Sequence, residues 1–312
     1  MTTIFILQAA LVCGVLVWLA NATVGNKTWA AAAIVLCALT LLGAGLVGTW
    51  VYPPVWSFGP VFAAFIVIAL RVWRRAGQVH NASAARTIVS GVGMVVFAVS
   101  AGVLLWHGAI GRTTPSETVF DLAAPIESEG VCAISAGASP LLNFHLATLQ
   151  PGRQHYRGQS YGVDFIAVSP AGFRTRDADW WRPAPVRPEQ YRIFAATVRA
   201  PCTGRVVSVH DGMPDQPAGV ADRSRMAGNH VVLRCEGYDV LLAHMRRGSV
   251  RVSDNQVVEV GAPLGEVGNT GNTGEPHLHV SAQRAMDPQP SFAGEPVHVS
   301  FGGRFMSRGM CL

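Results

Sequence analysis

The twelve residues from Gly268 to His279 have the types and the spacing of a catalytic metal site. His277 and His279 are two positions apart, so on an extended segment their imidazoles point to one face while Leu278 points to the other. Paired imidazoles on one face can hold a metal ion with one nitrogen and place a second nitrogen beside it. The segment therefore predicts a metal ion next to a second, free histidine.

Three earlier segments carry side chains that suit such a site. They are residues 143–145, which end in His145, residues 159–165, which contain Asp164, and residues 242–245, which contain His244. Together with the paired histidines and the intervening segments 200–206 and 261–265, they resemble the lysostaphin/LytM-type zinc metallopeptidases over about residues 130–300. The resemblance implies a compact antiparallel β core and zinc-dependent hydrolysis of peptide bonds in bacterial cell-wall peptidoglycan.

The resemblance also implies a role for each residue. Asp164 and His279 resemble the family's zinc ligands, and His244 and His277 resemble its two catalytic, non-ligand histidines, which act on the attacking water and on the tetrahedral intermediate. The chemistry agrees, because zinc takes nitrogen and oxygen ligands and a catalytic zinc site leaves one position for water. An imidazole can accept the proton of that water, and another can hydrogen-bond the oxyanion.

The chain departs from the family pattern at one position. The usual motif has a ligand histidine four residues before the aspartate, where this chain has Ser160. His145, in Asn143-Phe144-His145, resembles an N-x-H segment of a family branch whose aspartate follows a Gln-x-Tyr stretch, as it does here. His155 lies nearer to Asp164 in sequence but has no matching context. We expect His145 to be the third metal ligand; His155, or a domain without metal, are the alternatives.

The charge distribution indicates a membrane region in front of this domain. All 19 acidic residues follow Arg112, and from Arg112 onward there are also 19 arginines. The formal net charge of +5 therefore lies in the first 86 residues, on Lys27, Arg71, Arg74, Arg75 and Arg86. A basic balance placed in this way indicates membrane orientation and not nucleic-acid binding.

Four apolar runs before residue 109 predict four transmembrane helices, at residues 4–22, 29–52, 58–73 and 88–106. Crossing the hydrocarbon core takes about 20 helical residues, and the third run is short for this. The basic residues flank these runs so that positive-inside bias places both basic loops in the cytoplasm. We therefore expect a multi-pass protein of the bacterial cytoplasmic membrane with an extracytoplasmic C-terminal domain.

The positions of the cysteines are consistent with a membrane region followed by an extracytoplasmic domain. Cys13 and Cys37 lie in membrane runs as small apolar residues. Four more, at 132, 202, 235 and 311, lie in the outer domain, where disulfides can persist. Four cysteines allow three pairings. We favour Cys202–Cys235 on neighbouring predicted strands, with Cys132–Cys311 tying the ends of the domain.

The chain is thus expected to have a transmembrane region at 1–108, a linker at 109–130 and an all-β domain at 131–312. Short β-rich runs punctuated by Gly, Pro, Asn and Asp predict the strands of this domain. They lie at residues 162–168, 192–198, 204–209, 230–234, 238–244, 256–260, 263–267 and 278–282. Residues 173–188 look like an insertion, in which Trp180 and Trp181 cover the core or line a groove.

Two functions from different classes fit this sequence. The first is a membrane-anchored zinc endopeptidase that cuts peptidoglycan peptides. The second is a catalytically degenerate domain that binds the wall or regulates another envelope enzyme, with an envelope protein as partner. The presence of Asp164, His244, His277 and His279 together favours the enzyme, and Ser160 favours the alternative.

Overall fold

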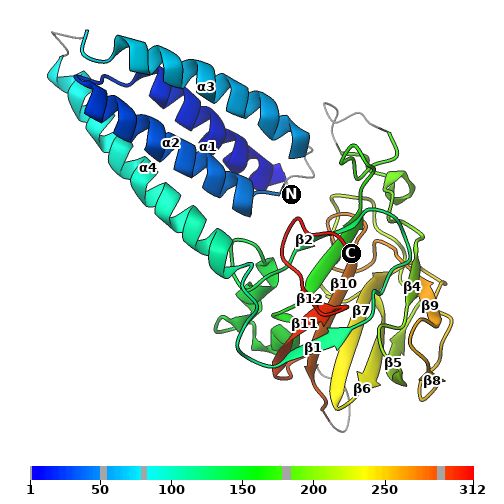
Figure 1. Ribbon diagram of the computed structural model, residues 1–312. Helices are drawn as coiled ribbons and strands as arrows, with labels where there is room; N and C mark the ends of the chain where they lie inside the picture. The colour runs from blue at the N-terminus through cyan, green and yellow to red at the C-terminus, as the bar shows by residue number, and fades with distance from the viewer. Residues whose placement is uncertain (1, 50–54, 79–82, 178–183, 287–291) are drawn as a thin grey trace. The chain divides into compact units, whose positions relative to one another are not determined.

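The chain forms a helical unit and a mostly-β unit, with the boundary between Ile110 and Gly111 (Figure 1). The computed structural model describes residues 2–49, 55–78, 83–177, 184–286 and 292–312. Trp180 and Trp181, expected to cover the core or line a groove, lie outside these residues. Each unit is described separately below.

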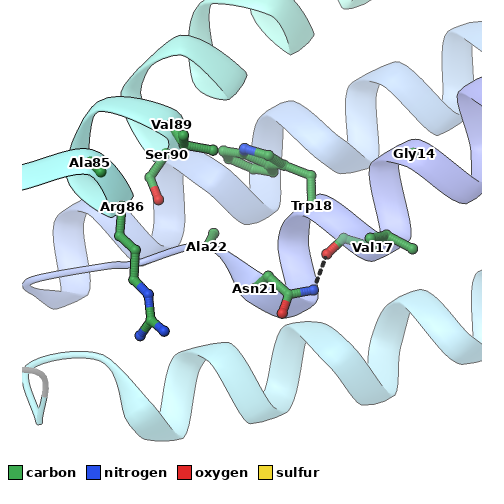
Figure 2. A pocket seen from close by; sticks show the side chains of 9 residues that line it. All are labelled: Gly14, Val17, Trp18, Asn21, Ala22, Ala85, Arg86, Val89 and Ser90. Carbon is green, nitrogen blue, oxygen red and sulfur yellow. Dashed lines mark hydrogen bonds between the residues drawn. The ribbon is translucent and has the colours of Figure 1, made fainter. Parts of the chain in front are cut away.

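The helical unit contains the four predicted apolar segments. They are α1 (Thr2–Asn21), α2 (Lys27–Val47), α3 (Phe58–Arg75) and α4 (Ala84–Ile110), with a short 3-10 turn, η1 (Val55–Ser57), before α3. Side chains of α1 and α4 line a cavity of about 670 Å³ (Figure 2). The Trp18 ring packs edge-on against Phe97 at 5.1 Å, and a side chain at Gly93 would overlap its indole. The absence of a side chain at Gly93 therefore leaves room for the Trp18 indole beside α4.

The prediction of four membrane spans needs a correction. Among the described residues, two helices are long and apolar enough to cross a membrane, α2 and α4. α3 has 18 residues and includes Arg71, Arg74 and Arg75, so its apolar part is too short. The described apolar part of α1, Ile6–Asn21, is shorter than a span.

The C-terminal unit confirms the mostly-β domain. Its strands are β1 (Val119–Leu122), β2 (Val131–Ser135), β3 (Val163–Ala167), β4 (Thr197–Arg199), β5 (Gly204–His210), β6 (Asn229–Cys235), β7 (Tyr238–Met245), β8 (Val257–Val258), β9 (Pro263–Glu266), β10 (Leu278–Arg284), β11 (Pro296–Phe301) and β12 (Arg304–Phe305). Within the described chain, ten of them form a sheet in the order β1-β11-β10-β7-β6-β5-β8, with β12 on β11, β3 on β10 and β2 on β3. β4 and β9 form a separate pair.

Each predicted strand overlaps an observed one, but the boundaries differ. The expected strand at 192–198 shrinks to β4, because residues 192–195 form turns and Ala195 has a positive φ of 65°. β1, β2, β11 and β12 were not predicted. β1 lies in the segment 109–130 that we expected to be a linker, and it pairs with β11 in parallel, against the otherwise antiparallel order. Its alternating buried residues Phe120 and Leu122 supply the packing.

The main core lies on one face of the large sheet. Leu278, Val280 and Ala282 of β10 point into it, together with Val163 and Phe165 of β3. The alternate residues of the same strands therefore face the other side, where the polar site lies. Both favoured disulfides are present, Cys132–Cys311 and Cys202–Cys235. The first ties β2 to the C-terminal end, and the second joins the start of β5 to the end of β6.

Candidate metal centre

Asp164 and His279 face each other across neighbouring strands. They are direct partners in the antiparallel pairing of β3 with β10, and both project from the face opposite the core. His279 Nδ1 lies 2.9 Å from Asp164 Oδ1. The alternation of the two strands thus places a carboxylate oxygen and an imidazole nitrogen at one point of the sheet.

His145 reaches the same carboxylate from a 3-10 turn, η2 (Phe144–Leu149). Its Nε2 lies 3.3 Å from Asp164 Oδ1. Asn143 caps the turn: its Oδ1 accepts from the backbone N–H of His145 and lies 2.9 Å from His145 Nδ1. Asn143 Nδ2 donates to the carbonyls of Gly137 and Gly162, so its Oδ1 is the end that faces the imidazole. The Asn-x-His segment therefore works as one unit that orients His145.

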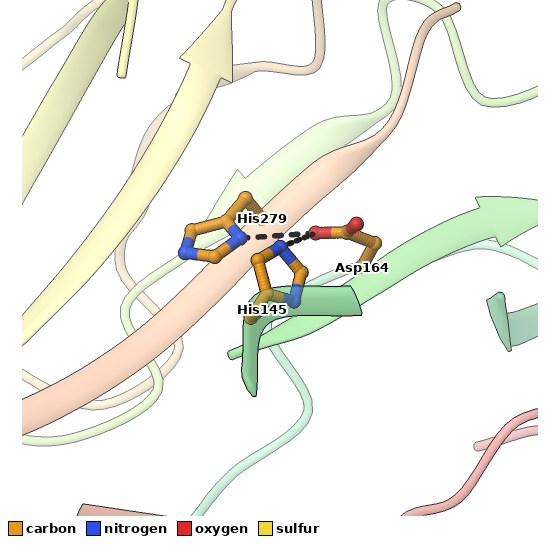
Figure 3. Close-up of side chains that lie close together, drawn as sticks. All are labelled: His145, Asp164 and His279. Atoms are coloured by element: carbon orange, nitrogen blue, oxygen red, sulfur yellow. Dashed lines mark hydrogen bonds and ion pairs between the residues drawn. The ribbon is translucent and has the colours of Figure 1, made fainter. Parts of the chain in front are cut away.

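The three predicted ligands come together, and the alternative histidine, His155, lies elsewhere. One ligand atom each from His145, Asp164 and His279 lies within 4.8 Å of the others (Figure 3). His155 is exposed in η3 (Gln154–Gln159), with its ring against Tyr156. The buried Ser160 hydroxyl donates to Arg157 O and lies 2.7 Å from Thr148 Oγ1. Thr148 Oγ1 in turn donates to the carbonyl of His145, so Ser160 supports the turn that carries the relocated histidine.

His244 joins this face through an irregularity in β7. Ala243 is the register partner of His279, and the strict alternation would turn His244 toward the core. The β6–β7 register shifts between Asn229 and Val231, which places one extra residue in β7, and His244 has a positive φ of 64°. Such a bulge re-aims a side chain. As a result the His244 ring lies 6.1 Å from the His279 ring and 4.6 Å from the His277 ring, between centroids.

His277 comes from the loop before β10 and completes the group. Its Nε2 lies 3.7 Å from Asp164 Oδ1. Glu275, two residues before His277, anchors this loop through a buried ion pair with Arg174, whose Nε lies 3.0 Å from Glu275 Oε2. All five side chains expected at the site therefore lie together, on four separate segments.

Hydrogen bonds fix the tautomers of His244 and His277. His244 Nδ1 lies 2.8 Å from Thr270 O, and His277 Nδ1 lies 2.8 Å from Glu275 O. A carbonyl oxygen can only accept, so both Nδ1 atoms carry the hydrogen and, in the neutral rings, both Nε2 atoms keep a lone pair. The His279 ring has different partners: its Nδ1 faces the Asp164 carboxylate, and its Nε2 lies 3.1 Å from Ser281 Oγ.

Burial and neighbouring charges set the ionisation of the group. Burial raises the pKa of Asp164, but His145 and His277 and the hydrogen bonds from His145 and His279 outweigh it and hold that pKa well below its ordinary value. Burial lowers the pKa of His145, which the Asp164 carboxylate overcomes to leave it raised. Burial and the neighbouring His277 and His279 lower the pKa of His244 well below its ordinary value, and burial lowers that of His279 to about 4. Asp164 is therefore ionised, and His244 and His279 are neutral, at pH 7.

Some supporting residues escaped the sequence analysis. Ser281 is two positions beyond His279, so strand alternation alone could have placed it beside that imidazole. Gly162 is needed because a Cβ there would lie 2.4 Å from Cε1 of His279. Arg174 and Glu275 are 101 positions apart, and no local pattern in the sequence indicates their ion pair.

A model of a known protein family matches part of the C-terminal unit. Residues 192–290 match the sequence model of peptidase family M23, a stretch that includes His244, His277 and His279 and begins after Asp164. No curated protein matches the chain.

Several solved structures are similar to the chain. A zinc-containing peptidase from Vibrio cholerae is 21% identical, with a TM-score of 0.26, over 44% of this chain and 28% of that one. Lysostaphin from Staphylococcus simulans is 20% identical, with a TM-score of 0.26, over 44% and 40%. A mutant catalytic domain of the prophage-encoded M23 protein EnpA from Enterococcus faecalis is 18% identical, with a TM-score of 0.30, over 56% and 93%. The chain thus spans less than half the length of the first two. On the match of residues 192–290 to the family model, the C-terminal unit carries a peptidase family M23 domain.

Proposed function

We propose that this chain is a membrane-anchored, zinc-dependent endopeptidase that hydrolyses peptide bonds in bacterial peptidoglycan. The observation that carries the proposal is the convergence of five side chains on one point. His145, Asp164 and His279 offer three ligand atoms within 4.8 Å of one another. His244 and His277 stand beside them, each with its Nδ1 bound to a backbone carbonyl.

The donor set fits zinc. Catalytic zinc sites use three protein ligands from histidine and carboxylate and keep one position open. Here the ligands are His145 Nε2, Asp164 Oδ1 and His279 Nδ1, and the second nitrogen of each imidazole lies beside an oxygen of Asn143 or Ser281. Such outer contacts orient metal ligands and raise their basicity. A zinc ion held there supplies Lewis acidity, which lowers the pKa of water to about 7.

The remaining two histidines suit proton transfer. In the neutral form of each ring, Nε2 of His244 or His277 can accept a proton from the attacking water, because the Nδ1 hydrogen is already bound to a backbone carbonyl. A histidine protonated in this way donates from Nε2 to the oxyanion or to the leaving amine. The positive φ of His244 is a strained backbone conformation, and such strain persists where surrounding contacts hold a functional side chain in place.

Three observations support the envelope location. α2 and α4 are long and apolar enough for a bilayer, and α4 leaves valines exposed along its length: Val89, Val92, Val95, Val96, Val99 and Val103. The C-terminal unit has two disulfides, which form and persist outside the cytoplasm. The family of the domain agrees with a wall peptide as substrate. We propose that the helical unit anchors the domain to the cytoplasmic membrane.

The test uses the full-length chain purified in detergent. Metal analysis should give about one zinc per chain, and incubation with purified peptidoglycan should release new amino groups. A chelator should stop this release, and added zinc should restore it. A chain that pellets with the wall but releases no amines, with or without zinc, would instead be the degenerate binding domain. Cleavage that continues after zinc is removed would exclude the metal mechanism.

A further inference from the structure

A row of side chains continues from the metal centre across the sheet. Asp164 on β3, His279 on β10 and Ala243 on β7 are successive register partners. Beyond the bulge at His244, the row reaches His230 on β6, and the register partner of His230 on β5 is His210. The rings of His210 and His230 stack at 5.8 Å between centroids.

The row stays on one face of the sheet throughout. Val231 and Leu233 of β6 point into the main core, so His230 points the other way, as His279 does. On this second face Ala227, Val232, Leu241 and Ala243 form a small apolar cluster of their own. His210 and the metal centre therefore lie on the same surface.

A pocket lies at the far end of this row. It has a volume of about 360 Å³ and is lined by Tyr156, His210, Ser224, Arg225, Met226, Ala227, Gly228, His230 and Phe292. Phe292 meets His230 edge-on at 5.7 Å between ring centroids. This volume is in the lower range of small-molecule sites and suits one or two amino-acid residues.

The wall of the pocket is joined directly to the catalytic face. The backbone N–H of His244 donates to Ala227 O. A Cβ on Gly228 would overlap the Thr270 backbone, whose carbonyl holds His244 Nδ1. The segment that forms one side of the pocket thus also positions a candidate catalytic histidine.

Among the lining residues that the structure describes, Arg225 carries a charge and none is acidic. Its NH1 group donates to His210 Nε2 at 3.2 Å, which turns the guanidinium toward the two imidazoles. Hydrogen bonds from the hydroxyl and the N–H of Ser224 lower the pKa of the nearby Asp222, and the charge of Arg225 adds to this effect. Beyond the NH1 contact with His210, the Arg225 guanidinium has further N–H groups that can donate to a planar anion such as a carboxylate.

We propose that this pocket is a substrate subsite that binds a free carboxylate of the peptide, with Arg225 as its charged anchor. The inference rests on the proposed peptidase function and adds the chemistry that selects the substrate. Neighbouring strands are about 4.8 Å apart, so two to three strand steps separate the pocket from His279 by roughly 10–14 Å. An extended peptide covers that distance in about three to four residues. The carboxylate should therefore lie about that far from the cleaved bond.

The experiment compares soluble peptidoglycan fragments with the same fragments after chemical amidation of their carboxylates. With the zinc-loaded full-length chain, amidation should raise KM about tenfold and leave kcat within about twofold, because one charge-assisted contact is lost. Arg225→Gln should raise KM for the native fragments by a similar factor and abolish the difference between native and amidated fragments. Arg223→Gln is the matched control, since Arg223 is exposed and does not line the pocket.

Synthetic peptides identify the source of the carboxylate. Copies of the best-cleaved fragment, amidated either at the C-terminus or on a side chain, should differ, and only one of them should show the raised KM. An Arg225→Gln chain that still discriminates native from amidated fragments as the wild type does would overturn the subsite.

A binding measurement separates the two proposals. Fluorescence anisotropy with labelled native and amidated fragments, in chelator, does not depend on catalysis. If the wild type cleaves nothing but binds native fragments more tightly through Arg225, the peptidase proposal fails and the subsite stands. Equal binding of both fragments by the wild type and by Arg225→Gln would contradict the subsite alone.

Discussion

The three proposed metal ligands, His145, Asp164 and His279, lie beside His244 and His277, yet the chain positions the two groups by different means. The ligands come from three segments, and side chains hold them: Asn143 orients His145, Ser281 contacts His279, and both imidazoles meet Asp164. Backbone carbonyls of a single loop, those of Thr270 and Glu275, hold His244 and His277. Metal binding should therefore depend on side-chain identity at several distant positions, and proton transfer on the local course of one loop.

The largest effect should come from removing the shared carboxylate. Asp164→Ala removes the oxygen that lies within 3.7 Å of three imidazoles, so the chain should lose zinc and its activity should fall at least about a thousandfold. Metal analysis and amine release measure the two losses. His145→Ala should behave in the same way, and His155→Ala, at an exposed position, should keep both zinc and activity. Zinc loss in His155→Ala with retention in His145→Ala would reverse the ligand assignment.

Substitutions of His244 and His277 should separate zinc binding from catalysis. His277→Ala and His244→Ala remove no ligand, so zinc content should stay near one per chain while kcat falls by about 10²–10⁴-fold, the usual loss for a general acid or base. The measurement pairs metal analysis with amine release on the same preparation. Loss of zinc from either variant would show that the two parts of the site are not independent.

A smaller effect on zinc affinity is expected from Asn143, which contacts the proposed ligand His145. Asn143→Ala deletes the acceptor on His145 Nδ1 and the cap of η2, so zinc affinity should fall about 10- to 100-fold. Competition with a zinc-binding dye measures this. Asn143→Asp keeps an acceptor but loses the Nδ2 hydrogen bonds to Gly137 and Gly162, and it should lie between the wild type and Asn143→Ala. An unchanged affinity in Asn143→Ala would mean that η2 alone orients the ligand.

The smallest effect concerns the metal-free protein and pH. The pKa of His279 falls from 6.5 to about 4 on folding, so below pH 6.5 the unfolded chain takes up a proton that the folded domain does not. Stability contributed by this residue is complete above pH 6.5 and is lost progressively as the pH falls toward 4, by at most about 3 kcal/mol. Hydrogen exchange of β10 in chelator, corrected for intrinsic rates, measures the loss. His279→Asn should remove this slope, and an unchanged slope would assign it to another group.

Features that depend on a local sequence pattern were predicted correctly more often than features that depend on distant segments. The pair His277–His279 was readable from its two-residue spacing, although only His279 lies within β10, which begins at Leu278. Neighbouring strand patterns led to Cys202–Cys235, which joins β5 and β6. β1 and β11 were missed, because their pairing joins segments about 180 positions apart and is parallel. The prediction of four spans was wrong because α3 carries Arg71, Arg74 and Arg75, and the described apolar part of α1, Ile6–Asn21, is shorter than a span.

The sequence by itself determined which side chains could do the chemistry: one aspartate, a set of histidines, and the strands that alternate them to one face. The tertiary structure decided which of them meet. His145 reaches Asp164 although 19 positions separate them, because its ring projects from η2 onto the carboxylate. His155 is only nine positions away but is exposed on η3. The tertiary structure also decided the bulge that brings His244 to the site, because an extra residue in β7 exists only relative to its pairing with β6.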